Sequence, residues 1–380
     1  MTKTITRFPS GVVTVPPSKS VYHRVLICRA LAGMPVEIPD VSDDIDATAR
    51  CLSAYLSGGE TLDCGESGST LRFLVPLMAA LGYTARFTGR GRLLERPMEP
   101  FLDELRRHGA DITREPDAIT VAGRLQSGEF SLRGDISSQF VTGLLLALPT
   151  VRGDSVIHLT SPLESRSYVD ITLDVMAKFG VTATVLPNGD YAVAGEQTYR
   201  AADIEIEGDF SQAAFFLAAQ ALGRDIDVRG LDYNSVQGDK KILEIIRDAA
   251  HPDGALRAVD VDASDIPDLV PPVAAMLACA DGVSRIYNAG RLRHKESDRL
   301  AAVSEELNAL GADVCIDGDA LVIHGKPRLA GGHCNSRNDH RIAMMCAVAA
   351  IRCDNPVVLE NAECVAKSFP DFWEKFEVSA

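Results

Sequence analysis

Two acidic residues in the second half of the sequence stand among basic ones. Asp268 opens an apolar segment, and Glu296 lies between Lys295 and Arg299. A carboxylate surrounded by cations is held ionised and can act as a base, whereas a catalytic acid needs a raised pKa, for which burial is one cause. Each residue has a structural alternative, since Asp268 can cap a helix and Glu296 can pair with Arg299. Because both alternatives are compatible with proton transfer, we take Asp268 and Glu296 as candidate catalytic residues.

Further basic residues lie at or close to short polar stretches that precede apolar segments. On an acidic protein a single arginine is more often a solvated surface charge. Recurrence beside helix openings instead indicates an anion site, because a helix N-terminus offers free N–H groups and a favourable dipole. We therefore predict a cleft for a multiply anionic substrate with phosphate and carboxylate groups. The basic residues are Lys19, Arg24, Arg72, Arg96, Lys295, Arg299, Arg341 and Lys367.

Six polar stretches of this kind recur along the chain, each followed by a run of small apolar residues. They stand at 18–20, 68–70, 137–139, 209–211, 266–268 and 338–340. Their mean spacing is about 64 residues, a period typical of repeated supersecondary units. Each run is apolar nearly all round and predicts a buried helix, for which Ser, Asp or Asn is an ordinary N-cap. The shared opening chemistry favours six copies of one unit over generic alternation of strands and helices.

A second recurring piece is an amphipathic helix that ends near a glycine and precedes two short strands. Examples end near Gly109, Gly180 and Gly311, and glycine at that place is a C-cap signal. Asn-Gly at 188–189 and Asp-Gly at 317–318 predict hairpin turns. The unit therefore has two helices and several strands, and the fold class is α/β. Three units make a domain of ordinary size, so six predict two similar domains with a crossing near Glu207.

The composition excludes several classes of function. The 380 residues include 38 Lys and Arg against 53 Asp and Glu, which gives a net charge of −15. So acidic a chain is poorly suited to nucleic acid or to an anionic membrane surface. The longest apolar runs are shorter than the roughly 20 residues that span a bilayer, and the N-terminal residues lack the apolar stretch of a signal peptide. We expect a cytoplasmic protein.

The sequence shows no motif for a cofactor or a metal. It has no P-loop and no G-x-G-x-x-G fingerprint, which argues against ATP and NAD. No histidine pair has metal-ligand spacing, so His23, His294 and His340 are expected to have structural or supporting roles. The nine cysteines include no C-x-x-C pair and favour buried thiols over disulfides or a zinc site. We expect no metal and no organic cofactor.

Ten segments of the sequence carry a family resemblance when they are taken together. They read PPSKSVYHR, CGESGSTLRF, ERPM, DISSQFVTGLLLALP, ESRSYVDITLDVM, IEGDFSQAAFFLAA, SDIPDLVPPVAA, HKESDRL, NDHRIAM and AKSFPDFW. In this order and at these spacings they resemble the 5-enolpyruvylshikimate-3-phosphate synthase (3-phosphoshikimate 1-carboxyvinyltransferase) family. The combination is far more specific than any one segment.

The resemblance implies a fold of two similar lobes, each built of three repeated βαβαββ-type units as an inside-out α/β barrel. The family's first strand belongs to the C-terminal lobe, so the lobes would comprise residues 16–206 and residues 1–15 plus 207–380. The active site would lie in the interlobe cleft, with both crossings acting as hinges. The six units counted from the sequence agree with this fold.

The resemblance also implies an enzyme, a transferase of the shikimate pathway in aromatic amino acid biosynthesis. It would transfer the enolpyruvyl group of phosphoenolpyruvate to the 5-hydroxyl of shikimate 3-phosphate and release phosphate. The reaction would proceed by addition and elimination through a tetrahedral intermediate, with no metal and no organic cofactor. Its partners would be these two small molecules, with no nucleic acid and no membrane, and we expect a monomer.

The family's site residues map onto matching positions of this sequence. Asp268 would be the base for the 5-hydroxyl, Glu296 would protonate the methylene carbon and later take a proton from the methyl group, and Lys19 would contact both substrates. Shikimate 3-phosphate would be bound by Lys19, Ser20, Arg24, Ser137, Ser138, Gln139, Ser165, Asp268 and Lys295. Phosphoenolpyruvate would be bound by Lys19, Gly68, Arg96, Gln139, Arg299, Arg341 and Lys367.

Two departures and two alternatives accompany the resemblance. Better-known members have Asn-Ala-Gly-Thr where this chain has Glu-Ser-Gly-Ser at 66–69. The chain is also shorter than most relatives, and the short interval between its first two openings is where we expect the missing residues. The sister transferase that acts on UDP-N-acetylglucosamine shares fold and chemistry, but it has a catalytic cysteine in a Gly-rich loop, and no cysteine here lies in a comparable loop. A non-catalytic anion-binding repeat protein, or an RNA-end-binding relative of the same unit, would not need Asp268 and Glu296 among the basic residues.

Overall fold

The structure, a computed structural model, describes residues 1–377 and divides the chain into two compact units. The N-terminal unit is Lys19–Ile206; the C-terminal unit combines Met1–Ser18 with the described residues from Glu207 onward. The sequence places the first crossing after residue 15, whereas the structure places it after Ser18. The reason is a pair of backbone contacts, since Ser18 N donates to Glu207 O (2.7 Å) and Pro17 forms an isolated bridge with Gly208.

The N-terminal unit contains two complete copies of a βαβαββ repeat. The first is β3 (Thr61–Asp63), α3 (Gly68–Leu81), β4 (Ala85–Thr88), α4 (Glu99–Arg107), β5 (Ala110–Arg114) and β6 (Ala118–Gly123). The second is β7 (Glu129–Leu132), α5 (Ser138–Ala147), β8 (Ser155–Leu159), α6 (Arg166–Lys178), β9 (Thr184–Val185) and β10 (Tyr191–Val193). The two sheets have the same order, β3-β4-β6-β5 and β7-β8-β10-β9, with a parallel first pair and antiparallel pairs after it.

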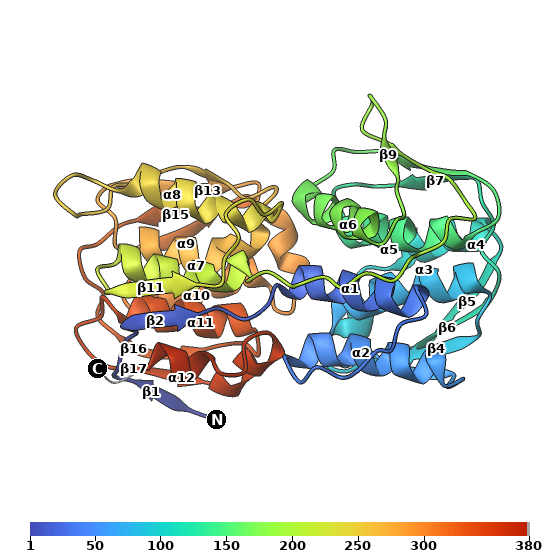
Figure 1. Ribbon diagram of the computed structural model, residues 1–380. Helices are drawn as coiled ribbons and strands as arrows, with labels where there is room; N and C mark the ends of the chain where they lie inside the picture. The colour runs from blue at the N-terminus through green and yellow to red at the C-terminus, as the bar shows by residue number, and fades with distance from the viewer. Residues whose placement is uncertain (378–380) are drawn as a thin grey trace. The chain divides into compact units, whose positions relative to one another are not determined.

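The third repeat of this unit is reduced to helices α1 (Lys19–Leu31) and α2 (Asp43–Leu56), with no strand assigned between residues 19 and 60. This reduction explains why the interval between its opening and the next is the shortest of the series. Figure 1 shows β4, β5 and β6 on the outside of the unit, with α1, α3 and α5 inside. Helices α3 and α5 are buried along almost their whole length, as expected for segments that are apolar all round.

The C-terminal unit contains one complete repeat. It runs through β12 (Val261–Asp262), α9 (Val270–Leu277), β13 (Val283–Tyr287), α10 (Arg299–Ala309), β14 (Val314–Asp317) and β15 (Ala320–His324), with sheet order β12-β13-β15-β14. The other elements are α7 (Phe210–Ala221), β11 (Ile226–Arg229), α8 (Ile242–Ala249), β16 (Gly332–Asn335), α11 (His340–Ala350), β17 (Val357–Glu360) and α12 (Phe372–Phe376). Short 3₁₀ helices η4 (Pro267–Leu269), η5 (Gly290–His294) and η6 (Ala362–Lys367) lie beside the candidate residues.

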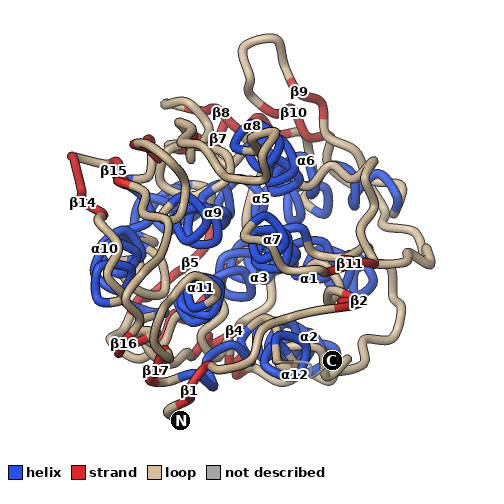
Figure 2. The backbone as a smooth tube through the Cα atoms, turned by 90° about the vertical axis from the view of Figure 1, so that its left-hand side faces the viewer, coloured by secondary structure: helices blue, strands red, loops and turns tan. Residues whose placement is uncertain are grey.

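The first strands of the chain complete sheets of the C-terminal unit. Strand β1 (Lys3–Ile5) pairs antiparallel with β17, and β2 (Gly11–Thr14) pairs parallel with β11. Figure 2 shows α7, α9 and α11 of this unit side by side and end-on, with the strands around them. Their apolar faces form the core of the unit together with the aromatic cluster of Phe216, Phe369, Phe372 and Phe376.

Each of the six predicted openings begins a helix within the described residues. The N-caps Ser67, Ser137, Asp209 and Asp339 accept backbone N–H groups through their side chains, as the polar stretches predict. The three glycines predicted to follow helices, at 109, 180 and 311, have positive φ. All nine cysteines are free thiols, and most are buried. Among the described residues, no helix has the length and apolarity needed to cross a membrane.

Candidate active site

Asp268 is the point on which the basic residues of the C-terminal unit converge. It lies in η4, just before the buried helix α9, and its side chain is 18% exposed. Oδ1 accepts from Arg299 Nη1 (3.1 Å) and lies 3.8 Å from Lys295 Nζ, and Oδ2 accepts from Arg341 Nη2 (2.9 Å). Three cations around one accessible carboxylate favour its ionised form, which is the form a general base needs.

Arg299 and Arg341 are held in position beside Asp268 by further hydrogen bonds to Asp339 and Ser211. Arg299, the first residue of α10, is 2% exposed and makes a two-pronged contact with the buried carboxylate of Asp339 (Nε–Oδ2 3.0 Å, Nη2–Oδ1 3.2 Å). Burial lowers the pKa of Arg299, but the negative charges of Asp339, Asp268 and Glu296 outweigh this effect, and its pKa is raised. Arg341 donates from Nη2 to Ser211 Oγ (3.0 Å) at the start of α7.

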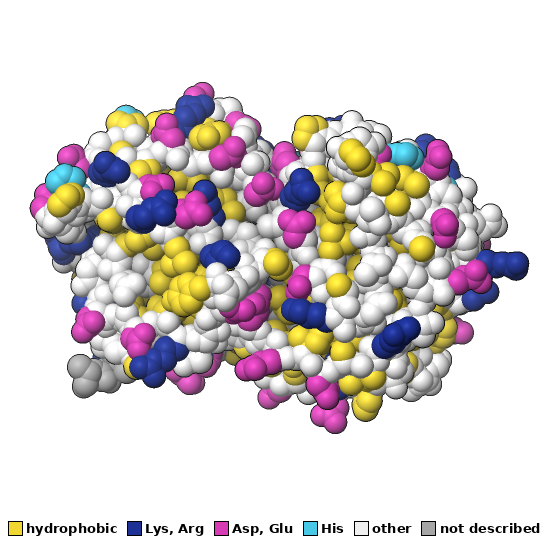
Figure 3. All heavy atoms as spheres, turned by 45° about the horizontal axis from the view of Figure 1, so that its top comes forward, with side chains coloured by type: hydrophobic (Ala, Val, Ile, Leu, Met, Phe, Trp, Pro, Cys, Tyr) yellow, Lys and Arg dark blue, Asp and Glu magenta, His cyan; other side chains and the backbone are white. Residues whose placement is uncertain are grey.

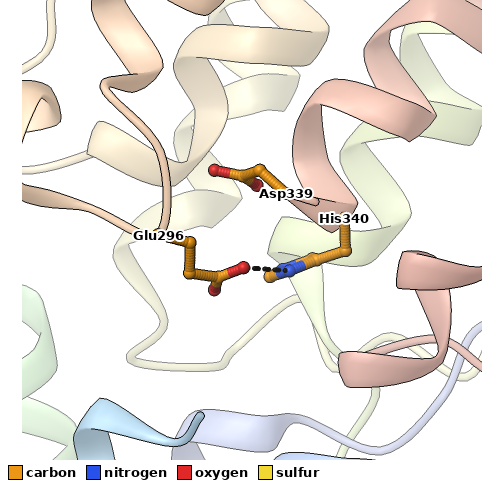
Figure 4. Close-up of side chains that lie close together, drawn as sticks. All are labelled: Glu296, Asp339 and His340. Carbon is orange, nitrogen blue, oxygen red and sulfur yellow. Dashed lines mark hydrogen bonds and ion pairs between the residues drawn. The ribbon is translucent and has the colours of Figure 1, made fainter. Parts of the chain in front are cut away.

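Glu296 is paired with His340, as Figure 4 shows: the carboxylate Oε2 lies 3.1 Å from Nδ1 of the histidine. His340 is 1% exposed and begins α11, so its ring is held by the core. Burial raises the pKa of Glu296, yet the charge of His340, its hydrogen bond and the charges of Arg299 and Lys367 outweigh burial, and the pKa lies well below its usual value. In the absence of substrate Glu296 is therefore ionised at neutral pH.

Two lysines complete the C-terminal group. Burial lowers the pKa of Lys295 to about 7, an effect that nearby Asp268 partly opposes. Lys367, at the end of η6, is 7% exposed and donates to the backbone carbonyl of Asn338 (2.7 Å). The aromatic cluster around Phe369 and Phe372 fixes the segment that follows Lys367. The structure thus brings together Asp268, Glu296, Lys295, Arg299, Arg341 and Lys367 from four separate segments of the sequence.

Glu296, Asp339 and His340 lie close enough to be considered as metal ligands, because one donor atom of each falls within 4.8 Å of the others. The arrangement nevertheless does not suit a cation. Both oxygens of Asp339 already accept from Arg299, and Oδ2 also accepts from Ser297 Oγ (3.0 Å). A metal ion would stand beside a buried guanidinium and displace these bonds. We assign the three residues to an ion-pair network.

In the N-terminal unit, Gly68, Arg96 and Gln139 form a second group. Gln139 accepts from Arg72 Nη1 (2.6 Å) and donates from Nε2 to Ser69 Oγ (2.9 Å), which links the first turns of α5 and α3. A Cβ atom at Gly68 would stand 2.6 Å from Arg96 Nη1, so only glycine leaves this arginine its position. Arg96 Nε is buried and has no hydrogen-bond partner among the described residues.

Arg72 adds a second positive charge to this group, beside that of Arg96. Burial and the neighbouring charge of Arg96 lower the pKa of Arg72 to about 9. Two guanidinium groups that destabilise each other at one helix N-terminus form an arrangement that a bound anion would relieve. Arg72 is one of the eight basic residues that the sequence analysis placed in the anion cleft, although the binding sets implied by the family resemblance do not include it.

The remaining predicted residues of this unit take varied positions. Lys19 begins α1 and pairs with Asp44 of α2 (2.7 Å). Arg24 is 2% exposed and donates to Thr172 Oγ1 (2.7 Å), Tyr168 O (2.8 Å) and the carbonyl of Ser20, while burial lowers its pKa to about 9. Arg24 thus makes internal bonds that the sequence did not predict.

Three serines lie at the starts of helices. Ser137 is the N-cap of α5, and Ser138 is the first residue of that helix. Ser165 precedes α6 in the left-handed conformation (φ 54°) and is 2% exposed. Asp339 and Ser211 are the further residues that the sequence analysis missed in the C-terminal unit, and both fall inside segments that were read as helix openings.

Comparisons with known proteins agree with this geometry. A sequence profile of EPSP synthase (3-phosphoshikimate 1-carboxyvinyltransferase) matches residues 53–376. The 3-phosphoshikimate 1-carboxyvinyltransferase of Clostridium kluyveri is 45% identical over 401 residues, covering 96% of this chain and 94% of that protein. The corresponding protein of Clostridioides difficile is 39% identical and covers 97% of this chain and 95% of that protein.

The chain belongs to the EPSP synthase family. A solved structure of EPSP synthase from Acinetobacter baumannii has the same fold, with a TM-score of 0.78 at 24% identity over 98% of this chain and 97% of that one. A second structure of EPSP synthase from that organism gives 0.77 at 22% identity over 100% and 99%. The predicted family, the α/β fold class and the predicted enzyme class are thereby confirmed. EPSP synthases transfer an enolpyruvyl group from phosphoenolpyruvate to shikimate 3-phosphate in aromatic amino acid biosynthesis, and the chain is an enzyme of this kind.

Proposed function

We propose that the chain transfers the enolpyruvyl group with Asp268 as the base and Glu296 as the acid. The observation that supports this assignment most directly is the set of three cations on Asp268, next to the Glu296–His340 pair. Ionised Asp268 takes the proton of the 5-hydroxyl of shikimate 3-phosphate. The oxygen then attacks C2 of phosphoenolpyruvate as C3 gains a proton, which gives the tetrahedral intermediate.

Glu296 must hold a proton to act as the acid, although its pKa lies well below the usual value in the free protein. Phosphoenolpyruvate supplies part of the change, because its phosphate and carboxylate place negative charge near Arg299 and Lys367, which lower the pKa of Glu296 in addition to the larger effect of His340. With the charges of Arg299 and Lys367 neutralised, the pKa of Glu296 rises in the direction that burial also favours, towards the protonated form. In the second step the Glu296 carboxylate takes a proton from the methyl group as phosphate leaves.

The substrate contacts follow the two groups of residues. Arg299, Arg341, Lys367, Lys19, Arg96, Gly68 and Gln139 bind phosphoenolpyruvate, and the unpartnered Nε of Arg96 supports this role. Ser20, Arg24, Ser137, Ser138, Ser165, Lys295, Lys19, Gln139 and Asp268 bind shikimate 3-phosphate. The internal bonds of Arg24 use four of its five N–H groups, because Nη2 donates to Thr142 Oγ1 (3.3 Å) as well as to Tyr168 O, so its contact with the substrate is through the remaining N–H of Nη1.

The other candidate functions receive less support. A cysteine nucleophile of the UDP-N-acetylglucosamine enzyme has no counterpart here, because Cys64 before the 65–69 loop is fully buried and burial raises its pKa. On the face shown in Figure 3, basic and acidic side chains are interspersed rather than gathered in a broad basic patch, which does not favour an RNA partner. We propose a monomer that acts in the cytoplasm on these two small molecules.

The test is release of inorganic phosphate from phosphoenolpyruvate with shikimate 3-phosphate as acceptor, with UDP-N-acetylglucosamine in a parallel reaction. Glu296→Gln and Asp268→Asn should each lower turnover by several orders of magnitude, because each removes a proton-transfer group. Glu305→Gln is the matched control, since Glu305 is exposed and pairs only with Arg337 on the surface. Phosphate release with the nucleotide sugar alone, or full turnover in either site variant, would contradict the proposal.

A further inference from the structure

A chain of four buried polar side chains runs through the N-terminal unit outside the two groups described above. His23 Nδ1 lies 2.7 Å from Thr48 Oγ1, Thr48 Oγ1 lies 2.6 Å from Thr70 Oγ1, and Thr70 Oγ1 donates to Ser67 Oγ at 2.7 Å. The exposed fractions of these residues are 1% or less. We call these residues, His23, Thr48, Thr70 and Ser67, the hydroxyl relay; it connects α1, α2 and α3, which pack side by side (Figure 1).

The direction of the hydrogen bonds follows from the number of protons available. Thr70 uses its only hydroxyl hydrogen on Ser67, so Thr48 must donate to Thr70, and His23 Nδ1 must donate to Thr48. This order requires a proton on Nδ1. Burial lowers the pKa of His23 to about 3, which keeps the ring neutral at physiological pH. The bare Nε2 has no hydrogen-bond partner among the described residues, and in this tautomer it leaves no donor unpaired.

The relay ends at the loop that precedes α3. Ser67 is the N-cap of α3, and the next two residues are Gly68, which faces Arg96, and Ser69, which accepts from Gln139. Ser67 N donates to Cys64 O at 2.9 Å, whereas the two bonds from the first turn of α3 to Ser67 are long, with Thr70 N–Ser67 Oγ and Leu71 N–Ser67 O both at 3.3 Å. The short side-chain contact of Ser67 is the one that it makes in the relay, with Thr70 Oγ1 at 2.7 Å.

We propose that His23, Thr48 and Thr70 are positioning residues for phosphoenolpyruvate, which fix the 66–69 loop and the amide groups at the N-terminus of α3. The inference rests on the proposed function, because it assigns phosphoenolpyruvate to Gly68 and Arg96. In this proposal none of His23, Thr48 and Thr70 touches the substrate. They act through Ser67, whose position decides where Gly68 and Ser69 lie relative to Arg96 and Gln139.

A purely structural role is the alternative, in which buried hydroxyl groups simply satisfy one another. The two roles differ in what removal of a hydroxyl changes. If the role is purely structural, loss of the hydroxyl lowers the stability of the protein and changes the affinities for the two substrates by the same factor. A displaced 66–69 loop weakens phosphoenolpyruvate more than shikimate 3-phosphate, because Gly68 and Arg96 are assigned to phosphoenolpyruvate only, whereas Gln139 is the one residue assigned to shikimate 3-phosphate that bonds to this loop.

The test compares Thr70→Val with Thr70→Ser in the full-length protein. Valine has the shape of threonine without the hydroxyl, whereas serine keeps the hydroxyl. Thr70→Val should raise the KM for phosphoenolpyruvate about tenfold, the loss expected for one buried hydrogen bond, and should leave the KM for shikimate 3-phosphate within about twofold. Thr70→Ser should restore the KM for phosphoenolpyruvate to within about threefold of the wild-type value.

Thr48→Val, one bond further from the loop, should change the same KM in the same direction, and it provides the measurement should Thr70→Val fail to fold. Ser304→Ala is the matched control, because its buried hydroxyl donates to Val314 O (2.9 Å) away from both groups. Equal rises in the two KM values, or identical behaviour of the valine and serine variants, would overturn the relay proposal. Absence of phosphate release by the wild-type protein would overturn the proposed function instead.

Discussion

Asp339→Asn isolates the most deeply buried charge pair of the C-terminal unit. Asp339 is fully buried, and Arg299, which is 2% exposed, donates two hydrogen bonds to it at 3.0 and 3.2 Å. Asparagine keeps the size of the side chain and an oxygen that can cap α11, so the substitution removes mainly the charge. Arg299 would retain only Asp268 at 3.1 Å as a direct anionic partner. Breaking one side of a buried pair costs about 3 to 5 kcal/mol, and we expect a loss of unfolding free energy near the lower end.

The loss should depend on pH in a defined direction. Burial raises the pKa of Asp339, but Arg299 outweighs burial and the pKa lies below its ordinary value. A carboxyl group whose pKa is depressed on folding contributes stability above its unfolded pKa, and this contribution disappears as the pH falls through the folded pKa. The difference between wild type and Asp339→Asn should therefore be complete at neutral pH and shrink below about pH 4.

Urea unfolding, monitored by tryptophan fluorescence, measures this difference in the C-terminal unit, where Asp339 lies. The chain has one tryptophan, Trp373, whose indole donates to Ala362 O (2.8 Å) in the C-terminal unit. Asp317→Asn is the control, because Asp317 is 65% exposed, pairs with Arg285 at the surface and should cost less than about 1 kcal/mol. A loss for Asp339→Asn no larger than that of the control, or one that does not shrink at low pH, would refute the reasoning.

Three further predictions follow from the same geometry. Because burial lowers the pKa of Lys295 to about 7, this lysine loses its positive charge between about pH 6 and about pH 8, and the KM for shikimate 3-phosphate should rise over that range. The rise should be smaller in Lys295→Gln, and equal pH profiles of the two proteins would contradict this role of Lys295. Gly68→Ala should raise the KM for phosphoenolpyruvate with little change in melting temperature, because the new Cβ would stand 2.6 Å from the flexible end of Arg96; an unchanged KM would count against the assignment. Arg24→Met should lower the melting temperature of the protein as well as the affinity for shikimate 3-phosphate, since Arg24 binds Thr172 and Tyr168 inside the fold. An affinity loss without any loss of stability would remove that structural role.

The parts of the structure that were predicted from sequence are local in origin. A polar cap followed by a run of small apolar residues determines where a helix begins, so α3, α5, α7 and α11 start at the expected places. The same locality applies to the glycines after helices, whose left-handed conformation is a property of a single residue.

The parts that were not predicted depend on contacts between distant segments. The bond of Arg24 with Thr172 spans 148 positions, and the pair of Arg299 with Asp339 spans 40. Neither partner has a periodic pattern that identifies the other. Thr48 and Thr70 likewise read as ordinary helical residues, and only the packing of α2 against α3 brings their hydroxyl groups together. Sequence motifs therefore indicate candidate substrate-binding residues, whereas the residues that hold these side chains in place are found only from the fold.

The pairing of β1 with β17 has a consequence for how the protein is made. Lys3 pairs with Leu359, so the beginning of the chain must wait for nearly all of the rest to be synthesised before its strand has a partner. At about 5 to 20 residues per second, the delay is on the order of tens of seconds. The continuous stretch Lys19–Ile206 can fold during this interval. During synthesis the segment Lys19–Ile206 is thus expected to fold first, while the N-terminal residues 1–18 remain unpaired until β17 has been made.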